Sequence, residues 1–162
     1  MMKRVLVISF MTTTIYAGSL FSVGQKNFGF SVGSSTGFGN TYTVVGGNFN
    51  YFVMDSLSMG VGYQGWFGHK PRVDEINIPV TYYFQYSPQY YPYIGFRYAH
   101  TSVGKYDGGS GYDYNTYGAR AGVAMNFGNN SYMSIGWVQD YREKDGISKS
   151  EGYPEVSMGI GF

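Results

Sequence analysis

The chain has 162 residues, a formal net charge of +1 and no cysteine. This length indicates a single folded domain, and the lack of cysteine excludes disulfide bonds and thiolate metal sites. The sequence contains neither a basic patch of the kind that binds nucleic acid nor an apolar run long enough for a transmembrane helix.

The N-terminus has the three parts of a secretory signal peptide. Two basic residues near the start are followed by a mostly apolar segment, and then by the small residues expected at a cleavage site. We therefore predict a signal peptide over residues 1–19, with cleavage after Ala17 or Ser19, followed by one mature domain over residues 20–162. The alternative is that the apolar segment forms a buried first strand or helix of the fold.

The remainder of the chain alternates apolar residues with small or polar ones, and turn-forming residues separate the alternating segments. Side chains on a strand point alternately to opposite faces, so this period of two predicts strands with one apolar face each. In chain order, the predicted strands span residues 27–33, 42–53, 57–64, 75–86, 91–101, 115–127, 132–142 and 155–162.

The connections between these strands differ in length. Three are short and lie around residues 55, 88 and 129, and four longer ones cover residues 34–41, 65–74, 102–114 and 143–152. Long and short connections alternate, as in a transmembrane barrel with short periplasmic turns and long extracellular loops. The predicted fold class is therefore all-β, an eight-stranded antiparallel up-and-down transmembrane β-barrel with both termini periplasmic.

The two faces of the strands differ in composition. One carries Phe, Tyr, Ile, Val and Met, whereas the other is rich in Gly, Ser, Ala and Asn and also carries charged residues. Because side chains just fill the interior of an eight-stranded barrel, we predict that the apolar face points outward to lipid and that glycines leave room inside for arginines. Tyrosines near strand ends, Tyr153 among them, are expected at the membrane interfaces. The alternative is a water-soluble ligand-binding barrel, whose apolar face would point inward.

The chain ends on an alternating segment in which Val156, Met158, Ile160 and Phe162 share one face. In a membrane barrel the last strand must pair with the first, because an open edge in lipid leaves backbone groups without hydrogen bonds. Pro154 precedes this segment and has no N–H to donate, so we expect an edge or a bulge at that point.

These features together resemble the small eight-stranded outer-membrane β-barrel family, which includes OmpA membrane-domain-like and opacity-type, porin-like barrels. The resemblance covers nearly the whole mature chain. It implies a place in the outer membrane of a Gram-negative bacterium, in contact with outer-membrane lipid and lipopolysaccharide. It also implies insertion by the barrel-assembly machinery, with periplasmic chaperones as further partners. The signal that this machinery reads corresponds here to Val156, Met158, Ile160 and Phe162.

Charged residues on the inward face indicate an interior ion network. Arg97 and Arg120 lie on sequential predicted strands, and two cations in a narrow interior repel each other unless carboxylates lie between them. We therefore predict a network that fills the lumen and has a structural role. Its candidate members are Arg97, Arg120, Asp140, Arg142, Glu155 and Glu75. The alternative is a narrow pore with the same lining.

The predicted loop over residues 65–74 combines aromatic and basic side chains. Its candidates for surface contact are Trp66, Phe67, His69, Lys70 and Arg72. Such a loop fits either an unknown surface ligand, as in an adhesin, or lipopolysaccharide, whose phosphates attract cations while aromatic rings lie at the interface.

The sequence offers little for catalysis. A barrel enzyme that modifies lipid A would need a histidine beside a serine and an acid, and the chain contains only His69 and His100. His100 shares the outward face with Tyr98. No cluster has the spacing of a metal site. We therefore predict no catalytic residue, cofactor or metal, and a structural or surface-interaction role.

Overall fold

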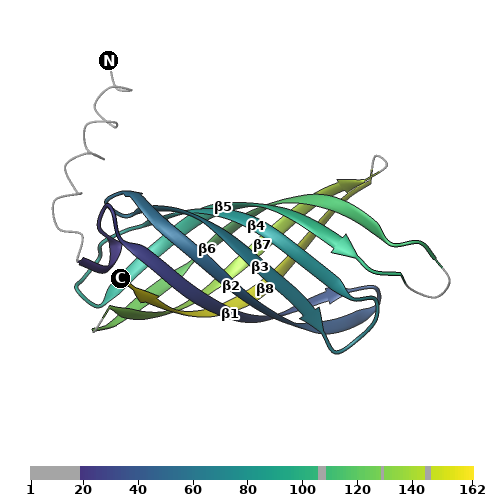
Figure 1. The fold of residues 1–162 in the computed structure, drawn as a ribbon, viewed down its shortest axis with the longest axis horizontal. Helices are drawn as coiled ribbons and strands as arrows, with labels where there is room; N and C mark the ends of the chain where they lie inside the picture. Colours follow the sequence, from purple (N-terminus) through teal and green to yellow (C-terminus); the bar gives the residue numbers. More distant parts are fainter. Residues whose placement is uncertain (1–18, 106–108, 129, 145–146) are drawn as a thin grey trace, which may run out of the picture.

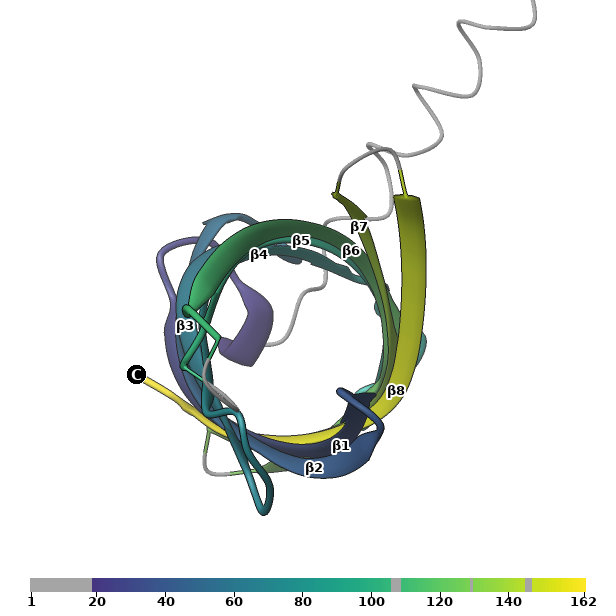
Figure 2. The same ribbon diagram turned by 90° about the vertical axis from the view of Figure 1, so that its right-hand side faces the viewer.

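The computed structural model describes residues 19–105, 109–128, 130–144 and 147–162. Residues 1–18, which hold most of the predicted signal peptide, lie outside the described residues. The described chain forms one closed barrel in which each strand pairs with its sequence neighbours and β1 pairs with β8 (Figures 1 and 2). The predicted all-β, eight-stranded antiparallel fold is confirmed. Within the described residues, no helix combines the length and apolar character that a membrane span needs.

A short 3-10 helix, η2 (Ser19–Phe21), precedes the barrel. The strands are β1 (Lys26–Gly37), β2 (Asn40–Met54), β3 (Leu57–Phe67), β4 (Val73–Tyr83), β5 (Tyr90–Val103), β6 (Tyr112–Gly128), β7 (Ser131–Lys144) and β8 (Ile147–Gly161). The helix η2 and the C-terminus lie at the same end of the barrel (Figure 1). We call this end the terminal rim and the opposite end the far rim.

The strands extend further toward the far rim than the sequence predicts. β1 and β2 pair continuously from Lys26↔Tyr51 to Gly37↔Asn40, so the predicted loop over residues 34–41 is a turn of residues 38–39. Phe38 and Gly39 have φ angles of 53° and 75°. Positive φ at both central positions matches the type I′ turn, whose twist fits that of paired strands.

The predicted alternation of long and short connections is wrong. At the far rim β7 and β8 leave only residues 145–146 between them, and β3 and β4 leave residues 68–72. At the terminal rim the connection over residues 84–89 is longer than either. The polar, glycine-rich composition near the far rim indicates side chains without lipid contact. It does not prevent the strands from pairing there, because hydrogen bonds between strands satisfy the backbone N–H and C=O groups.

The outer surface of the barrel is apolar, and the middle of its interior is polar. Outward positions along the strands carry exposed apolar side chains such as Phe96, which is 74% exposed. Inward positions carry buried polar residues such as Asn50, Thr81 and Thr101. This arrangement agrees with the predicted outward apolar face, and it is the reverse of a soluble barrel with an apolar interior.

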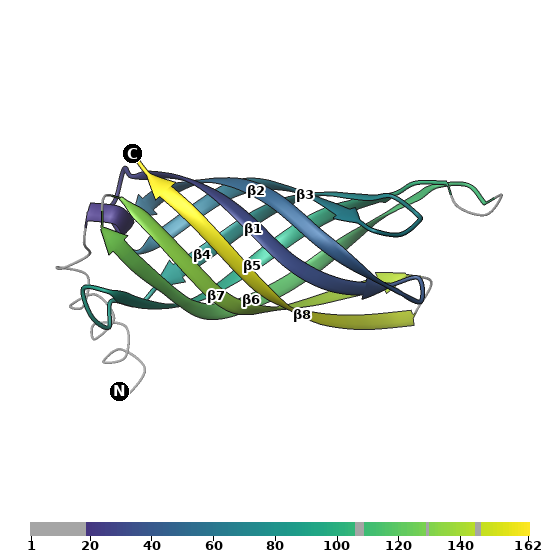
Figure 3. The ribbon, with the colours of Figure 1, turned by 90° about the horizontal axis from the view of Figure 1, so that it is seen from below.

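The barrel closes where β8 runs beside β1 (Figure 3). At the far rim this pairing ends before the strands do. The β1–β8 ladder extends from Asn27↔Gly161 to Gly33↔Glu155 and stops before Pro154, which lacks an N–H. The described β6–β7 ladder likewise begins at Tyr117↔Tyr141. Beyond these points the β7–β8 hairpin stands away from the ring of strands on both sides (Figure 2). The edge expected at Pro154 is therefore present.

Candidate functional site: the barrel lumen

The middle of the lumen is occupied by Arg97, which is 6% exposed. Its Nη2 donates a hydrogen bond to Glu75 Oε1, and its Nη1 donates to the hydroxyl of Tyr153 over 2.8 Å. Its Nε lies 3.4 Å from Asp140 Oδ1, within ion-pair distance. One guanidinium thus connects β4, β5, β7 and β8 across the interior.

Further polar side chains satisfy the carboxylate of Glu75. Asn77 Nδ2 donates to Glu75 Oε1 over 3.3 Å, and Thr101 Oγ1 donates to Glu75 Oε2 over 3.4 Å. A buried charge is tolerated only when it is paired and hydrogen-bonded, so these contacts offset the loss of hydration of the carboxylate.

A second ion pair joins Arg120 on β6 to Glu155 on β8. The guanidinium carbon of Arg120 also lies 5.2 Å from the ring centroid of Tyr93, a cation–π distance. Arg120 is two residues nearer the terminal rim than Gly118, which pairs with Arg97. The two arginines therefore lie at different depths.

Glycines make room for both arginines. In the β5–β6 ladder Arg97 pairs with Gly118, and Gly95 pairs with Arg120. A Cβ built at Gly118 would lie 2.7 Å from Arg97 Cγ, and one at Gly95 would lie 3.1 Å from Arg120 Cγ. Both approaches are tighter than ordinary contact, so side chains at these positions would displace the arginines.

The six residues predicted for one network fall into three groups. Glu75, Arg97 and Asp140 form the first, and Arg120 and Glu155 the second. Arg142 lies at the far rim and pairs over 2.9 Å with Glu151, a residue that the prediction missed. Sequence alternation assigned these residues to the inward face, but it could not show which of them meet.

The position of Tyr153 differs from the one predicted from the sequence. It was predicted at the membrane interface, yet it points inward, is 5% exposed and contacts Arg97. Its hydroxyl also donates to Asp140 Oδ2 over 3.5 Å. Tyr153 lies two residues before Glu155, and residues two apart on a strand share a face, so the sequence did carry the signal for this inward position.

The space left in the lumen is small. A cavity of about 30 Å³ lies beside Arg97 and Arg120, and another of about 20 Å³ lies beside Asp140 and Arg142. The first has room for roughly one or two water molecules. Gln64 Oε1 and Arg120 Nε are buried near it without a protein hydrogen-bond partner, so the cavity is polar and suits water.

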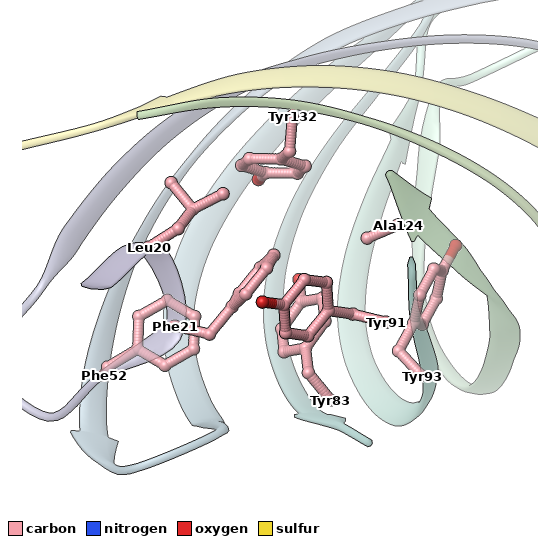
Figure 4. Packing of buried hydrophobic residues seen from close by; sticks show 8 residues of the cluster. All are labelled: Leu20, Phe21, Phe52, Tyr83, Tyr91, Tyr93, Ala124 and Tyr132. Carbon is pink, nitrogen blue, oxygen red and sulfur yellow. The ribbon is translucent and has the colours of Figure 1, made fainter. Parts of the chain in front are cut away.

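An aromatic cluster, which we call the terminal plug, fills the lumen at the terminal rim (Figure 4). The helix η2 lies within the ring of strands (Figure 2), and its residues Leu20 and Phe21 are buried in this cluster. Phe21 is fully buried, and its ring centroid lies 4.6 Å from that of Tyr83 and 4.4 Å from that of Tyr91. The cluster consists of Leu20, Phe21, Phe52, Tyr83, Tyr91, Tyr93, Ala124 and Tyr132.

Backbone hydrogen bonds hold the terminal plug in place. Ser56 N donates to Phe21 O over 2.8 Å, and Gly24 N donates to Phe52 O over 2.9 Å. Val23 N donates to Asp55 Oδ1 over 2.8 Å. Sequence reasoning missed this plug because Leu20 and Phe21 directly follow the predicted signal peptide. Large aromatics at inward positions beside short turns, such as Phe52, were the available signal.

The far rim has an apolar cluster that includes one predicted surface residue. Trp66 lies in β3, points inward and is 8% exposed, with its ring 5.6 Å from that of Tyr42. Its assignment to a surface loop is therefore wrong, because β3 extends through Phe67. The cluster contains Tyr42, Val44, Trp66, Val73 and Val103.

The other predicted surface residues lie at or beyond the end of β3. Phe67 is the last residue of β3 and is 58% exposed. His69, Lys70 and Arg72 belong to the connection over residues 68–72. Arg72 Nε donates to Asp74 Oδ2 over 2.7 Å, and this hydrogen bond raises the pKa of the Arg72 guanidinium.

No protein-family model matches the chain, and no curated protein sequence matches it. Solved structures do match. The N-terminal β-barrel domain of Pseudomonas aeruginosa OprF is 17% identical with a TM-score of 0.67, covering 84% of this chain and 97% of that domain. Neisserial surface protein A is 19% identical with a TM-score of 0.61, and the match covers 85% of this chain and 94% of that protein. The chain has the fold of the small eight-stranded outer-membrane β-barrels.

A third structure with this outer-membrane barrel fold is Ail, the attachment invasion locus protein of Yersinia pestis. It is 12% identical with a TM-score of 0.51, and the match covers 86% of this chain and 99% of Ail. At such identities the likeness concerns the fold. The resemblance seen in the sequence is thus confirmed at the level of architecture.

In the outer-membrane barrel fold the C-terminal strand closes the sheet. Phe162 N donates to Lys26 O over 2.8 Å, and Lys26 N donates to Phe162 O over 3.1 Å. The Phe162 ring lies 6.5 Å from that of Phe49. The side chains of Val156, Met158, Ile160 and Phe162 are all exposed on the outer surface. Their role as an assembly signal stays a prediction.

The histidine considered for catalysis lies in β5. His100 is exposed, and its Nδ1 lies 2.8 Å from Asn115 Oδ1 across the β5–β6 ladder. In the part of the chain that the structure describes, no group of three or more histidine, aspartate or glutamate side chains is arranged to hold a metal ion.

Proposed function

We propose that the protein is a small outer-membrane barrel with a closed lumen and a structural or surface-interaction role. It is exported by its signal peptide and lies in the outer membrane of a Gram-negative bacterium. Its termini are periplasmic and its far rim is extracellular. The observation that carries this proposal is a lumen whose buried charges are paired across the interior, inside a barrel whose outer surface is apolar.

Three layers of side chains support the closed lumen. The terminal plug fills one end, the two ion groups of Arg97 and Arg120 occupy the middle, and the Trp66 cluster occupies the far end. An ion crossing the barrel would have to displace each layer, and the remaining cavities are only water-sized. This arrangement favours a structural lumen over a pore.

Conductance in planar lipid bilayers tests this proposal. The purified, folded protein is expected to give no steady channels, because paired charges and aromatic rings obstruct the path. Val61→Ala, on the outer surface, is a matched control that should behave as wild type. Steady wild-type channels that disappear on substitution of Arg97 would contradict the proposal and establish the narrow pore.

Surface binding is a second candidate, and the exposed connection between β3 and β4 favours it. Phe67 is exposed, and the Arg72 side chain is 77% exposed next to Lys70 and His69. Two proteins of similar fold are named a surface protein and an attachment invasion locus protein. A Lys70→Gln, Arg72→Gln variant should then lose attachment to cells or matrix. Unchanged attachment would count against this role.

A further inference from the structure

The β7–β8 hairpin has an unpaired edge at the far rim. β8 pairs with β1 only as far as Glu155, whereas its pairing with β7 continues toward the tip of the hairpin. Within the described residues, the stretch 148–154 of β8 therefore pairs with β7 on one side and with no strand on the other. We call this free side of β8 the open edge. Because the hairpin stands away from the ring of strands, the open edge is accessible (Figure 2).

The backbone groups of the open edge have a known direction. Phe162 exchanges two hydrogen bonds with β1 across the closing seam. In an antiparallel ladder every second residue directs its N–H and C=O to the same neighbour, so those of Ser148, Ser150 and Gly152 point out of the open edge. Pro154 has the same orientation but no N–H, which explains why pairing with β1 stops there. Such a row of unpaired groups is a template for a further strand.

The side chains along the open edge do not suit lipid. The exposed apolar row of β8 runs from Phe162 to Val156. Beyond it, the outward face carries only small or hydroxyl-bearing residues as far as Ser148, and the inward face carries Lys149 and Glu151. The open edge thus lies beyond the apolar band of the barrel, where contact with another protein replaces contact with lipid.

The two charged residues of the open edge are complementary to a second copy of themselves. Lys149 lies opposite Arg142 in the β7–β8 ladder, and like charges in this arrangement repel. No described carboxylate forms an ion pair with Lys149, whereas Glu151 pairs with Arg142 over 2.9 Å. Lys149 and Glu151 flank Ser150 symmetrically. Two open edges that pair antiparallel around Ser150 therefore place each Lys149 opposite the Glu151 of the other copy.

Other registers of this self-pairing fit less well. A centre on Lys149 or on Glu151 would set like charges opposite each other. A centre on Gly152 would bring Pro154 opposite Ser150, where the N–H for one hydrogen bond is missing. With the centre on Ser150, the N–H groups of the open edge all find acceptors. The Lys149–Glu151 contacts then form at non-hydrogen-bonded positions, where opposite side chains lie closest.

We propose that the open edge binds the open edge of a second copy of this chain, as an antiparallel strand pair about a twofold axis at Ser150. Such an axis is perpendicular to the sheet and reverses directions within it, so the two barrel axes point in opposite directions. Barrels in one membrane share one direction, so the second copy lies on a facing membrane. The inference rests on the proposed placement with the far rim outside, and it names a partner for the surface-interaction role.

Disulfide cross-linking of the purified full mature protein in a non-ionic detergent tests this pairing, because the chain has no cysteine of its own. Under mild oxidation Ser150→Cys should form dimers, since Cα atoms of a hydrogen-bonded pair lie about 5.5 Å apart, within disulfide range. Ser148→Cys should not, because its two copies would lie roughly 14 Å apart along the strands. Ser34→Cys, at an exposed serine of β1, is a second control.

An exchange of charges tests the register independently. In the Ser150→Cys background, Lys149→Glu and Glu151→Lys should each lower the yield of dimer about tenfold, because like charges would then face each other on both sides of the axis. A mixture of the two variants should restore the yield, because every cation of one variant faces an anion of the other.

Three results would overturn the proposal. Cross-linking of Ser148→Cys as strong as that of Ser150→Cys would indicate parallel or random contact. A Ser150→Cys protein that stays monomeric would show that the edges do not pair, and a mixture no better than the single charge variants would refute the register. All variants are first shown to migrate as compact, heat-modifiable barrels on SDS gels. A failure to pair then refutes the self-association and leaves the proposed function intact.

Discussion

At the residue scale, the described ion pairs of this barrel differ in how strongly stability depends on them. Arg120 and Glu155 have side chains that are 15% and 7% exposed, whereas those of Arg142 and Glu151 are 21% and 32% exposed. Removing one partner of a buried pair leaves an uncompensated charge, whereas water more readily replaces one partner of a pair that is less buried. The lumen pair is therefore the structural one.

We expect Glu155→Gln to lower the free energy of unfolding by about 3–5 kcal/mol, because Arg120 would remain buried without its carboxylate. Urea titration of the folded protein in detergent micelles measures this change. Glu151→Gln is the matched control, and it should cost less than about 1 kcal/mol. Equal effects of the two substitutions would show that the Arg120–Glu155 pair has no special structural role.

At the scale of elements, η2 acts as part of the core although it lies outside the sheet. Phe21 packs among rings from β2, β4, β5 and β7, and its carbonyl accepts a hydrogen bond from the β2–β3 turn. The short helix thereby ties the start of the mature chain to the interior of the barrel. This arrangement explains why the segment between η2 and β1 also pairs with β2.

Phe21→Ala should destabilise the barrel by about 3–5 kcal/mol, since it deletes a fully buried aromatic ring from the terminal plug. Val23→Ala is the control two residues away, where the side chain is 58% exposed, and its effect should stay within about 0.5 kcal/mol. The unfolding midpoint in urea gives both values. A Phe21→Ala protein as stable as wild type would mean that the plug does not contribute to the core.

The last strand supports a prediction about assembly. Deleting Phe162 should reduce the fraction of protein that inserts, because the residue pairs with Lys26 at the closing seam and completes the outward apolar row of β8. Phe127→Ala is the control, because Phe127 is a similarly exposed aromatic near the same rim. The amount of inserted protein is measured in outer-membrane fractions. Equal insertion of both variants would argue against an assembly role for the C-terminal residue.

At the scale of the whole molecule, the sequence predicts the architecture better than the interior. Alternation alone placed Phe96 outside and Arg97 inside, because lipid and lumen impose opposite chemistry on successive residues. It could not show that Arg97 reaches Asp140, because these residues lie on β5 and β7 and meet across Gly118 of β6 only once the three strands pair.

The far rim was predicted least well. Residues 34–37 were assigned to a loop from their polar composition, yet they pair fully with β2. Strand pairing depends on backbone hydrogen bonds, and residue composition does not reveal these. Contact with lipid depends on side chains, so residue composition does reveal it. The predicted loop position of Trp66 is wrong for the same reason, because β3 continues through this residue and its side chain points into the lumen.

As a whole molecule, the protein is expected to be a folded barrel in the outer membrane. The most direct measurement is fractionation of cells that express the full chain, followed by SDS gels of boiled and unboiled samples. We expect recovery in the outer-membrane fraction and a compact, faster-migrating band that shifts on boiling. Recovery in the soluble periplasmic fraction, or one unchanged band with and without boiling, would contradict it.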